Sequence, residues 1–328
     1  MIPRLAIDDE WAEDLQRMGA LARGWPVPVV SNAIYQRPDD PSVTPRMLGI
    51  ARELRASGVD FRHLASPRSI ELVLNFHQCM VFLYVPAWNA LVQGGLDPAE
   101  RMRRLASAEW RAEARAQWDS VREGFPRPGA EHILRIVSVG RPELEPWLGQ
   151  SLSAWMAGRF AHASDALAHW VLENGLETEL AFSYTNTDPD AVAQLMRAEE
   201  TLVSASDAGA HIAMFDGAGD TTLLLTRHVR DRRDLSLEEA VRRLSAEPAR
   251  LLRLAGRGLL REGAFADITV FDPEALAWHR EERARDLPGG RSRFRRPPGG
   301  FRYTLVNGEV VQQDGLATAS LPARFLTG

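Results

Sequence analysis

Residues 203–211 read Val203-Ser-Ala-Ser-Asp-Ala-Gly-Ala-His211 and continue a segment of β-branched and small residues that begins at Thr201. This order predicts a buried strand that ends in a loop carrying a carboxylate, a glycine and a histidine. The catalytic groups of a (β/α) barrel lie at the carboxyl ends of its strands, so Asp207 is placed to be one of them. A carboxylate there can ligate a divalent metal, or move a proton from a metal-bound water to a leaving group. A turn without chemistry is the alternative interpretation.

The chain before this loop alternates predicted helices and strands. Helical spacing over residues 9–23 is followed by a short strand at 27–34, and a helix from Thr44 to Ser57 is followed by a strand at 59–65. This alternation indicates parallel strands that are joined by crossover helices. The fold class that it predicts is α/β.

Two further patterns set the expected domains. A strongly charged stretch around residues 98–125 predicts a helical insertion, and beyond Gly263 the pattern changes to period two, with a hairpin expected on an Asn307-Gly308 turn. We therefore expect residues 1–255 to form part of a (β/α)8 (TIM-type) barrel. Residues 256–328 are expected to form a small C-terminal β-sandwich appendage.

The composition is that of an ordinary globular protein, with 45% hydrophobic and 25% charged residues in a chain of 328. A net charge of -5 argues against a general nucleic-acid binder. The single cysteine, Cys79, excludes an internal disulfide and indicates a reducing, cytoplasmic compartment. The uncharged run from Leu72 to Leu96 is interrupted by polar residues, so we expect a buried segment and no membrane partner.

Seven short segments of the C-terminal third follow one another in a fixed order: Ser206–His211, Leu223–Arg230, Leu235–Val241, Ser245–Ala249, Arg257–Gly263, Ala266–Pro273 and Val306–Val310. Each segment alone is common, whereas all of them in this order form a specific pattern. In this pattern the chain resembles the amidohydrolase superfamily, and specifically the N-acyl-D-amino-acid deacylase (D-aminoacylase) group.

The resemblance implies a metal-dependent hydrolase in which zinc polarises a carbonyl and activates a water. It implies Asp207 as the general base and acid and as a metal ligand. His211 is a candidate to line the same pocket, and Arg227 is a candidate to bind a substrate carboxylate through two parallel hydrogen bonds. For both residues a structural or solvated role is the alternative. The expected reaction is hydrolysis of an amide C–N bond in a small molecule resembling an N-acyl amino acid.

Two motifs of the family are missing. Its His-x-His pair occurs nowhere in the 328 residues, and Phe215–Asp220 stands where D-aminoacylases place a His-Pro-Arg. The chain therefore resembles the C-terminal portion of such an enzyme, with the N-terminal metal-binding half absent and most zinc ligands outside it. One alternative is a non-catalytic or truncated protein of this fold that acts as a binding or interaction subunit. Another is a metal-independent hydrolase that uses Asp207 and His211 as an acid/base pair.

Open strand edges are expected in such a portion of a barrel. Unpaired edges favour association with another chain. We therefore expect a homo-oligomer, or a complex with the missing N-terminal half, in addition to a small-molecule substrate.

Overall fold

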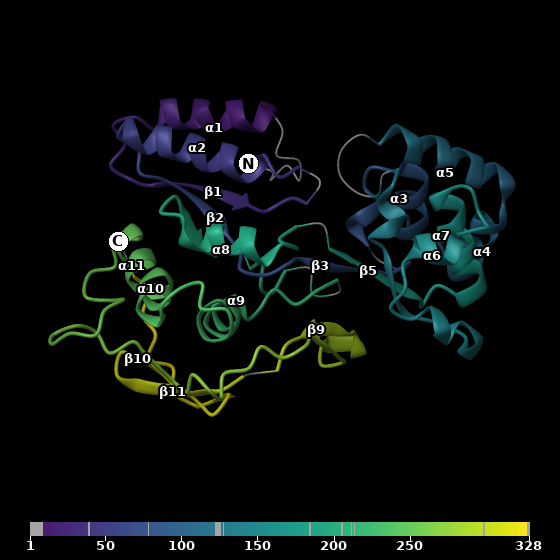
Figure 1. Ribbon diagram of the computed structural model, residues 1–328. Helices are drawn as coiled ribbons and strands as arrows, with labels where there is room; N and C mark the ends of the chain where they lie inside the picture. The colour runs from purple at the N-terminus through teal and green to yellow at the C-terminus, as the bar shows by residue number, and fades with distance from the viewer. Residues whose placement is uncertain are drawn as a thin grey trace. The chain divides into compact units, whose positions relative to one another are not determined.

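The structure is a computed structural model that describes residues 9–38, 40–77, 79–121, 126, 128–183, 185–204, 206–210, 212, 214–297 and 299–326. The chain forms two compact units. Unit 1 comprises Met1–Ser69, Thr185–Ile212 and Asp216–Gly328, and unit 2 comprises Ile70–Tyr184 and Ala213–Phe215. Figure 1 shows both units, with labels on many of the helices and strands.

A three-stranded parallel sheet lies at the centre of unit 1. Its strands are β1 (Val29–Ile34), β2 (Phe61–Ala65) and β6 (Thr201–Val203), paired in the order β1-β2-β6. Helix α2 (Val43–Ala56) connects the first two strands, as the alternation of the sequence predicts. The predicted strands before Gln36, Ser66 and Ser204 and the α/β character of this unit are thereby confirmed.

Two helices pack together beside this sheet, namely α1 (Asp9–Leu21) and α2 (Figure 1). Their contact is close because Gly19 has no side chain: a Cβ there would lie 2.1 Å from Cδ2 of Leu54. The buried apolar residues of both helices join one hydrophobic cluster with β1 and β2 and with α8 (Pro189–Arg197). Burial of these side chains is the main force that holds the helices on the sheet.

The C-terminal part of unit 1 begins with short helical segments: α9 (Asp220–Leu223), the π-helical η4 (Leu224–Asp231), α10 (Leu237–Val241), the π-helical η5 (Arg242–Ala246) and α11 (Glu247–Leu251). An antiparallel sheet follows in the order β12-β11-β10-β7, with strands Leu316–Ala317, Glu309–Gln313, Phe301–Val306 and Ile268–Phe271. The predicted hairpin is confirmed, because Asn307 and Gly308 both have positive φ, as a type I′ turn requires. A separate pair joins β8 (Glu282–Ala284) to β9 (Arg293–Arg295), with η6 (Pro288–Gly290) between them.

Unit 2 does not continue the parallel alternation. Its strands β3 (Glu71–Leu74), β5 (Glu179–Ser183) and β4 (Arg135–Ser138) pair antiparallel in the order β3-β5-β4. Its helical elements are η1 (Met80–Phe82), α3 (Pro86–Gln93), α4 (Pro98–Ala106), α5 (Ala108–Ser120), η2 (Ala130–His132), η3 (Pro142–Trp147), α6 (Leu152–Met156) and α7 (Ala163–Asn174). The charged stretch predicted as a helical insertion forms α4 and α5. They are separated at Ser107, whose hydroxyl caps α5 by accepting from the amide of Trp110.

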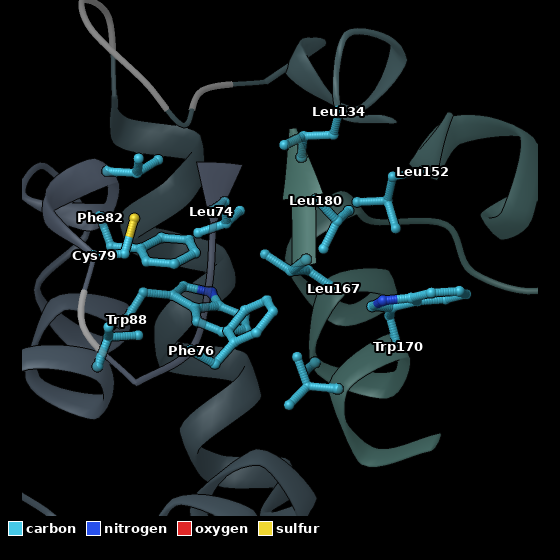
Figure 2. Packing of buried hydrophobic residues seen from close by; sticks show 14 of the residues in the cluster. Leu74, Phe76, Cys79, Phe82, Trp88, Leu134, Leu152, Leu167, Trp170 and Leu180 are labelled. Atoms are coloured by element: carbon cyan, nitrogen blue, oxygen red, sulfur yellow. The ribbon is translucent and has the colours of Figure 1, made fainter. Parts of the chain in front are cut away.

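The core of unit 2 is rich in aromatic side chains (Figure 2). The indole nitrogen of Trp88 donates to the Ser164 hydroxyl at 2.8 Å, and that of Trp170 donates to the Thr178 hydroxyl at 2.9 Å. Cys79 is buried beside them, and burial raises its pKa to about 11, so the thiol is neutral packing. No helix in the described part of the chain is long and apolar enough to cross a membrane.

Candidate functional site

Polar residues follow all three strands of the parallel sheet in unit 1. Gln36 comes after β1, Ser66 and Arg68 come after β2, and Ser206 and Asp207 come after β6. Parallel strands end at the same edge of a sheet, so these loops lie at one edge. In α/β folds this edge is where ligands bind.

A buried ion pair lies at this edge. Nε of Arg68 donates to Oδ1 of Asp220 at 2.7 Å, and the Ser66 hydroxyl donates to Oδ2 at 2.7 Å. The Arg68 and Asp220 side chains are only 3% and 6% exposed. Burial raises the pKa of the Asp220 carboxyl, whereas the Arg68 charge and the Ser66 hydrogen bond act to lower it. The carboxylate thus has a partner at each oxygen.

The same guanidinium reaches the loop that carries the candidate aspartate. Nη2 of Arg68 donates to the carbonyl oxygen of Ser206 at 2.5 Å. On another side of the loop lies Gly217, where a Cβ would be 2.0 Å from that carbonyl oxygen and 2.7 Å from the carbonyl carbon of Asp207. Only a glycine can approach a backbone so closely. The loop is therefore held between a buried arginine and a glycine backbone.

Asp207 itself is exposed and has a φ of 51°, in the left-handed region. Its carbonyl accepts from the amide of Ala210 at 3.0 Å, and the Ser206 hydroxyl accepts from the amide of Ala208 at 3.3 Å. Aspartate tolerates this backbone conformation better than most residues. Its carboxylate is free to meet a ligand, at the position after β6 that the sequence predicts. Its chemical role stays a prediction.

Two side-chain amides tie the first two loops together. Oδ1 of Asn186 accepts from the amide of Gln36 at 2.8 Å, while its Nδ2 donates to the carbonyls of Ser66 and Arg68, both at 3.0 Å. Oε1 of Gln36 accepts in return from the amide of Thr187 at 2.9 Å. Asn186 and Gln36 are both buried, so these hydrogen bonds do not compete with water.

The Gly217 loop is fixed from the opposite direction by Arg296. Nη2 of Arg296 pairs with Oε1 of Glu281 at 2.7 Å, and its Nε donates to the carbonyl of Ala218 at 3.0 Å. Oε2 of Glu281 accepts from the amide of Asp216 at 3.1 Å. These contacts hold residues 216–218 in place.

The two other predicted site residues have different outcomes. His211 lies outside the described residues. Arg227 lies on η4, half-buried, with its guanidinium carbon 5.8 Å from the ring centre of Trp278. Arg296 faces the same ring at 4.0 Å. Burial is the main factor that lowers the pKa of Arg227, and the nearby positive charge of Arg232 lowers it further. Binding of a substrate by Arg227 stays a prediction.

Sequence patterns alone did not identify the residues that build this edge. Ser66, Arg68, Asn186 and Gln36 were not predicted as site residues, and Asp220 entered only as the end of a loop. The one local signal is position, since Ser66-Pro-Arg68 directly follows a predicted strand. Within the described ranges, no group of three or more His, Cys, Asp or Glu side chains is arranged to hold a metal ion.

Comparison with known proteins shows what this chain is similar to. Residues 154–312 match the family model described as "Amidohydrolase family". An N-acyl-D-glutamate deacylase from Alcaligenes xylosoxydans xylosoxydans is 33% identical over 132 residues, which are 39% of this chain and 25% of the relative. An uncharacterized protein from Mycobacterium tuberculosis is 29% identical over 279 residues, 81% of this chain and 44% of the relative.

Solved structures agree with this result. A D-aminoacylase described by its binuclear metal center gives a TM-score of 0.52 at 19% identity, over 95% of this chain and 52% of its own. The N-acyl-D-glutamate deacylase from Bordetella bronchiseptica, in complex with zinc and a phosphonate inhibitor, gives a TM-score of 0.52 at 22% identity. The match covers 94% of this chain and 52% of the deacylase chain. The chain thus spans about half the length of these structures and less of the curated relatives.

The fold is therefore of the amidohydrolase type, with mixed α/β content. Residues 154–312 match the amidohydrolase family model, and solved structures that share the fold include D-aminoacylases and an N-acyl-D-glutamate deacylase. The resemblance seen in the ordered segments of the C-terminal third is confirmed.

Proposed function

We propose that this chain serves the hydrolysis of an amide C–N bond in a small substrate resembling an N-acyl amino acid, with Asp207 as general base and acid. The observation that carries the proposal is the place of Asp207. It is an exposed carboxylate at the carboxyl edge of a parallel sheet, on a loop held by Arg68 and Gly217 in an amidohydrolase-family domain. Carboxylates in such positions transfer protons during hydrolysis.

The proposed reaction requires one proton transfer in each direction. Asp207 takes a proton from the water that attacks the acyl carbon, and the tetrahedral intermediate then expels the amine as the C–N bond breaks. Asp207 returns the proton to the leaving nitrogen, so the products are a carboxylic acid and an amine. Arg227 is proposed to bind an acidic group of the substrate, because its half-buried guanidinium can donate two parallel hydrogen bonds to a carboxylate.

The finer architecture belongs to the same proposal. We infer that β1, β2 and β6, with their crossover helices, form part of a (β/α)8 barrel and that the barrel portion of this chain lies within residues 1–255. The antiparallel sheet β12-β11-β10-β7 then belongs to a β-sandwich appendage within residues 256–328. Parallel pairing in the first sheet and hairpin pairing in the second support this division.

Zinc is present in the related deacylase structure. The described residues of this chain do not make a site for such an ion by themselves, since they contain no cluster of three suitable ligands and the Asp207 carboxylate is exposed on its loop. Three or four closely spaced protein ligands are the usual requirement for zinc. The proton transfer proposed for Asp207 therefore rests on its position alone.

The test is amine release from a panel of N-acyl amino acids by the purified chain. Asp207→Asn keeps the shape of the side chain and removes its basicity, so we expect a loss of kcat of about 100-fold or more. Asp314→Asn is the matched control, because Asp314 is also an exposed aspartate with positive φ, located in a turn of the appendage. An unchanged kcat in Asp207→Asn, or no amine release by the unsubstituted chain from any substrate, would contradict the proposal.

A non-catalytic role as an interaction subunit is the second candidate, and one observation favours it. The register of the antiparallel sheet places Val270, Tyr303, Gln313 and Leu316 on one face, and the three hydrophobic residues of this set are exposed. Exposed apolar patches of this kind mark protein interfaces. We propose a second copy of the chain as the occupant, since an apolar face is complementary to itself in a two-fold dimer.

A further inference from the structure

Arg68 connects three segments that are far apart in the sequence. Its own loop follows β2, its Nε binds the carboxylate of Asp220 at the start of α9, and its Nη2 binds the carbonyl of Ser206 in the loop after β6. Within its own loop, the amide of Arg68 donates to the hydroxyl of Ser66 at 3.2 Å. One planar group thus fixes the spacing of the three segments.

Burial makes these bonds strong and directional. With the Arg68 side chain 3% exposed, water does not compete for the guanidinium, and hydrogen bonds to a charged donor are about twice as strong as neutral ones. Nε and Nη2 stand at a fixed distance on a rigid plane. A lysine ammonium at the same place is a point donor that cannot span Asp220 and the Ser206 carbonyl in the same way.

Close packing around the Ser206 carbonyl restricts the backbone conformation of its loop. Gly217 approaches that oxygen so closely that a Cβ would be 2.0 Å away. The next residue, Asp207, holds a left-handed φ of 51°, which the loop must keep against the preference of a non-glycine residue. Arg68 therefore binds the backbone one residue before Asp207, whose backbone conformation sets the direction of the carboxylate.

We propose that Arg68 is a positioning residue: by binding the Ser206 carbonyl it holds the backbone of Asp207 in place, and Asp220 in turn holds Arg68. The consequence for catalysis rests on the proposed function of Asp207. The positioning of the loop does not rest on that function, because it concerns backbone hydrogen bonds that are measurable without a substrate.

The experiment is amide hydrogen exchange at Ala208 and Ala210, whose amides are bonded inside the loop, to the Ser206 hydroxyl and the Asp207 carbonyl. In Arg68→Lys we expect exchange at both amides to rise at least about tenfold, the factor that corresponds to losing one hydrogen bond. The amide of His63 in β2, which donates to the carbonyl of Glu200, reports whether the sheet remains folded. Its exchange is expected to stay unchanged.

Arg62→Lys is the matched control. Arg62 is also a buried arginine of the β2 segment, but its Nη1 binds Asp60 at 3.1 Å and the carbonyl of Phe61 at 2.9 Å, with no hydrogen bond to the described residues of the Ser206 loop. Its substitution is expected to leave the loop amides as they are. Asp220→Asn is a second variant, expected to raise their exchange because it releases Arg68.

Rescue separates positioning from simple packing. In Arg68→Gly, millimolar guanidinium ion is expected to restore protection of Ala208 and Ala210, while sodium at equal ionic strength does not. Unchanged exchange in Arg68→Lys, an equal rise at His63, or no rescue by guanidinium would overturn the proposal. Activity distinguishes the two claims: if the loop responds as expected but Asp207→Asn retains full kcat, the proposed function fails and the positioning role stands.

Discussion

The hydroxyl oxygen of Ser31 lies 2.5 Å from Nδ1 of His63. The two residues are partners on β1 and β2, and both are buried in unit 1. Burial lowers the pKa of His63 to about 4, so its ring is neutral near pH 7. Nε2 is 3.1 Å from the carbonyl of Met47, which can only accept, so Nε2 carries the single proton and Nδ1 accepts from Ser31.

This neutral histidine predicts a loss of stability in mild acid. The folded pKa of about 4 lies below the ordinary value of 6.5, so the unfolded chain binds the proton more readily between the two. The contribution of neutral His63 to the free energy of unfolding is present above pH 6.5 and is lost as the pH falls towards 4. The total loss is about 3 kcal/mol. Urea unfolding of the chain between pH 7.5 and 4 measures this loss.

His63→Leu is the variant that isolates the histidine. It removes the titrating group, so the free energy of unfolding is expected to fall less steeply from pH 6.5 to 4, although the variant starts from a lower value at neutral pH. His279→Gln, at an exposed histidine, is the control and keeps the steep fall. Equal slopes in His63→Leu and the unsubstituted chain would show that His63 does not titrate as a buried group.

Gly217 gives a second prediction. An added methyl group would meet the backbone of the Ser206–Asp207 loop, which cannot move without breaking the bond to Arg68. We expect Gly217→Ala to cost about 1–3 kcal/mol. Gly49→Ala in α2 is the control, since nothing lies within 4 Å of its Cβ and alanine stabilises a helix interior by about 0.5–1 kcal/mol. Thermal unfolding should shift in opposite directions, and equal shifts would rule out the close contact.

Local patterns predicted the elements of unit 1 to within a few residues. The strand expected at 27–34 is Val29–Ile34 and the helix expected at 44–57 is Val43–Ala56, because hydrophobic period and turn residues act over a few neighbours. The position of Asp207 followed from the same signals. They could not predict the antiparallel pairing of β3, β4 and β5, which depends on how the helices between these strands pack around the tryptophans.

Local patterns could not predict the polar contacts at the edge of the parallel sheet, because the partners are far apart in the sequence. Arg68 and Asp220 are 152 residues apart, and Gln36 and Asn186 are 150 apart. Apart from the place of Arg68 directly after a predicted strand, nothing in the neighbours of either pair distinguishes them from solvated surface residues. Only the fold, which brings the ends of β1, β2 and β6 together, makes them partners.

The apolar face of the antiparallel sheet predicts self-association. On this face Tyr303, 39% exposed, pairs with Val270 at 42%, and Gln313 of β11 lies between Tyr303 and Leu316 at 74%. We expect light scattering at micromolar concentrations to give a dimer. Tyr303→Lys should shift it to a monomer, while Arg302→Lys, on the opposite face, should not. A monodisperse monomer of the unsubstituted chain would contradict a dimer.

Asn186 gives the last prediction, because both the oxygen and the nitrogen of its side-chain amide have defined partners. Asn186→Asp keeps an acceptor for the amide of Gln36 but removes both donors to the carbonyls of Ser66 and Arg68, and it turns a negative charge towards them. Leaving buried carbonyls without donors costs about 1–3 kcal/mol each, so we expect the free energy of unfolding to fall by at least about 2 kcal/mol. Asn307→Asp is the control. Asn307 has a similar positive φ, and its Oδ1 accepts from Nη2 of Arg257 at 2.8 Å, an interaction that a carboxylate strengthens. Its Nδ2 donates to one carbonyl, that of Pro322 at 2.9 Å, and losing this half-buried bond is expected to cost less than the change at Asn186. Denaturant unfolding of both variants at pH 7.5 decides the matter: if they lose the same stability, the Asn186 amide does not hold the two loops together.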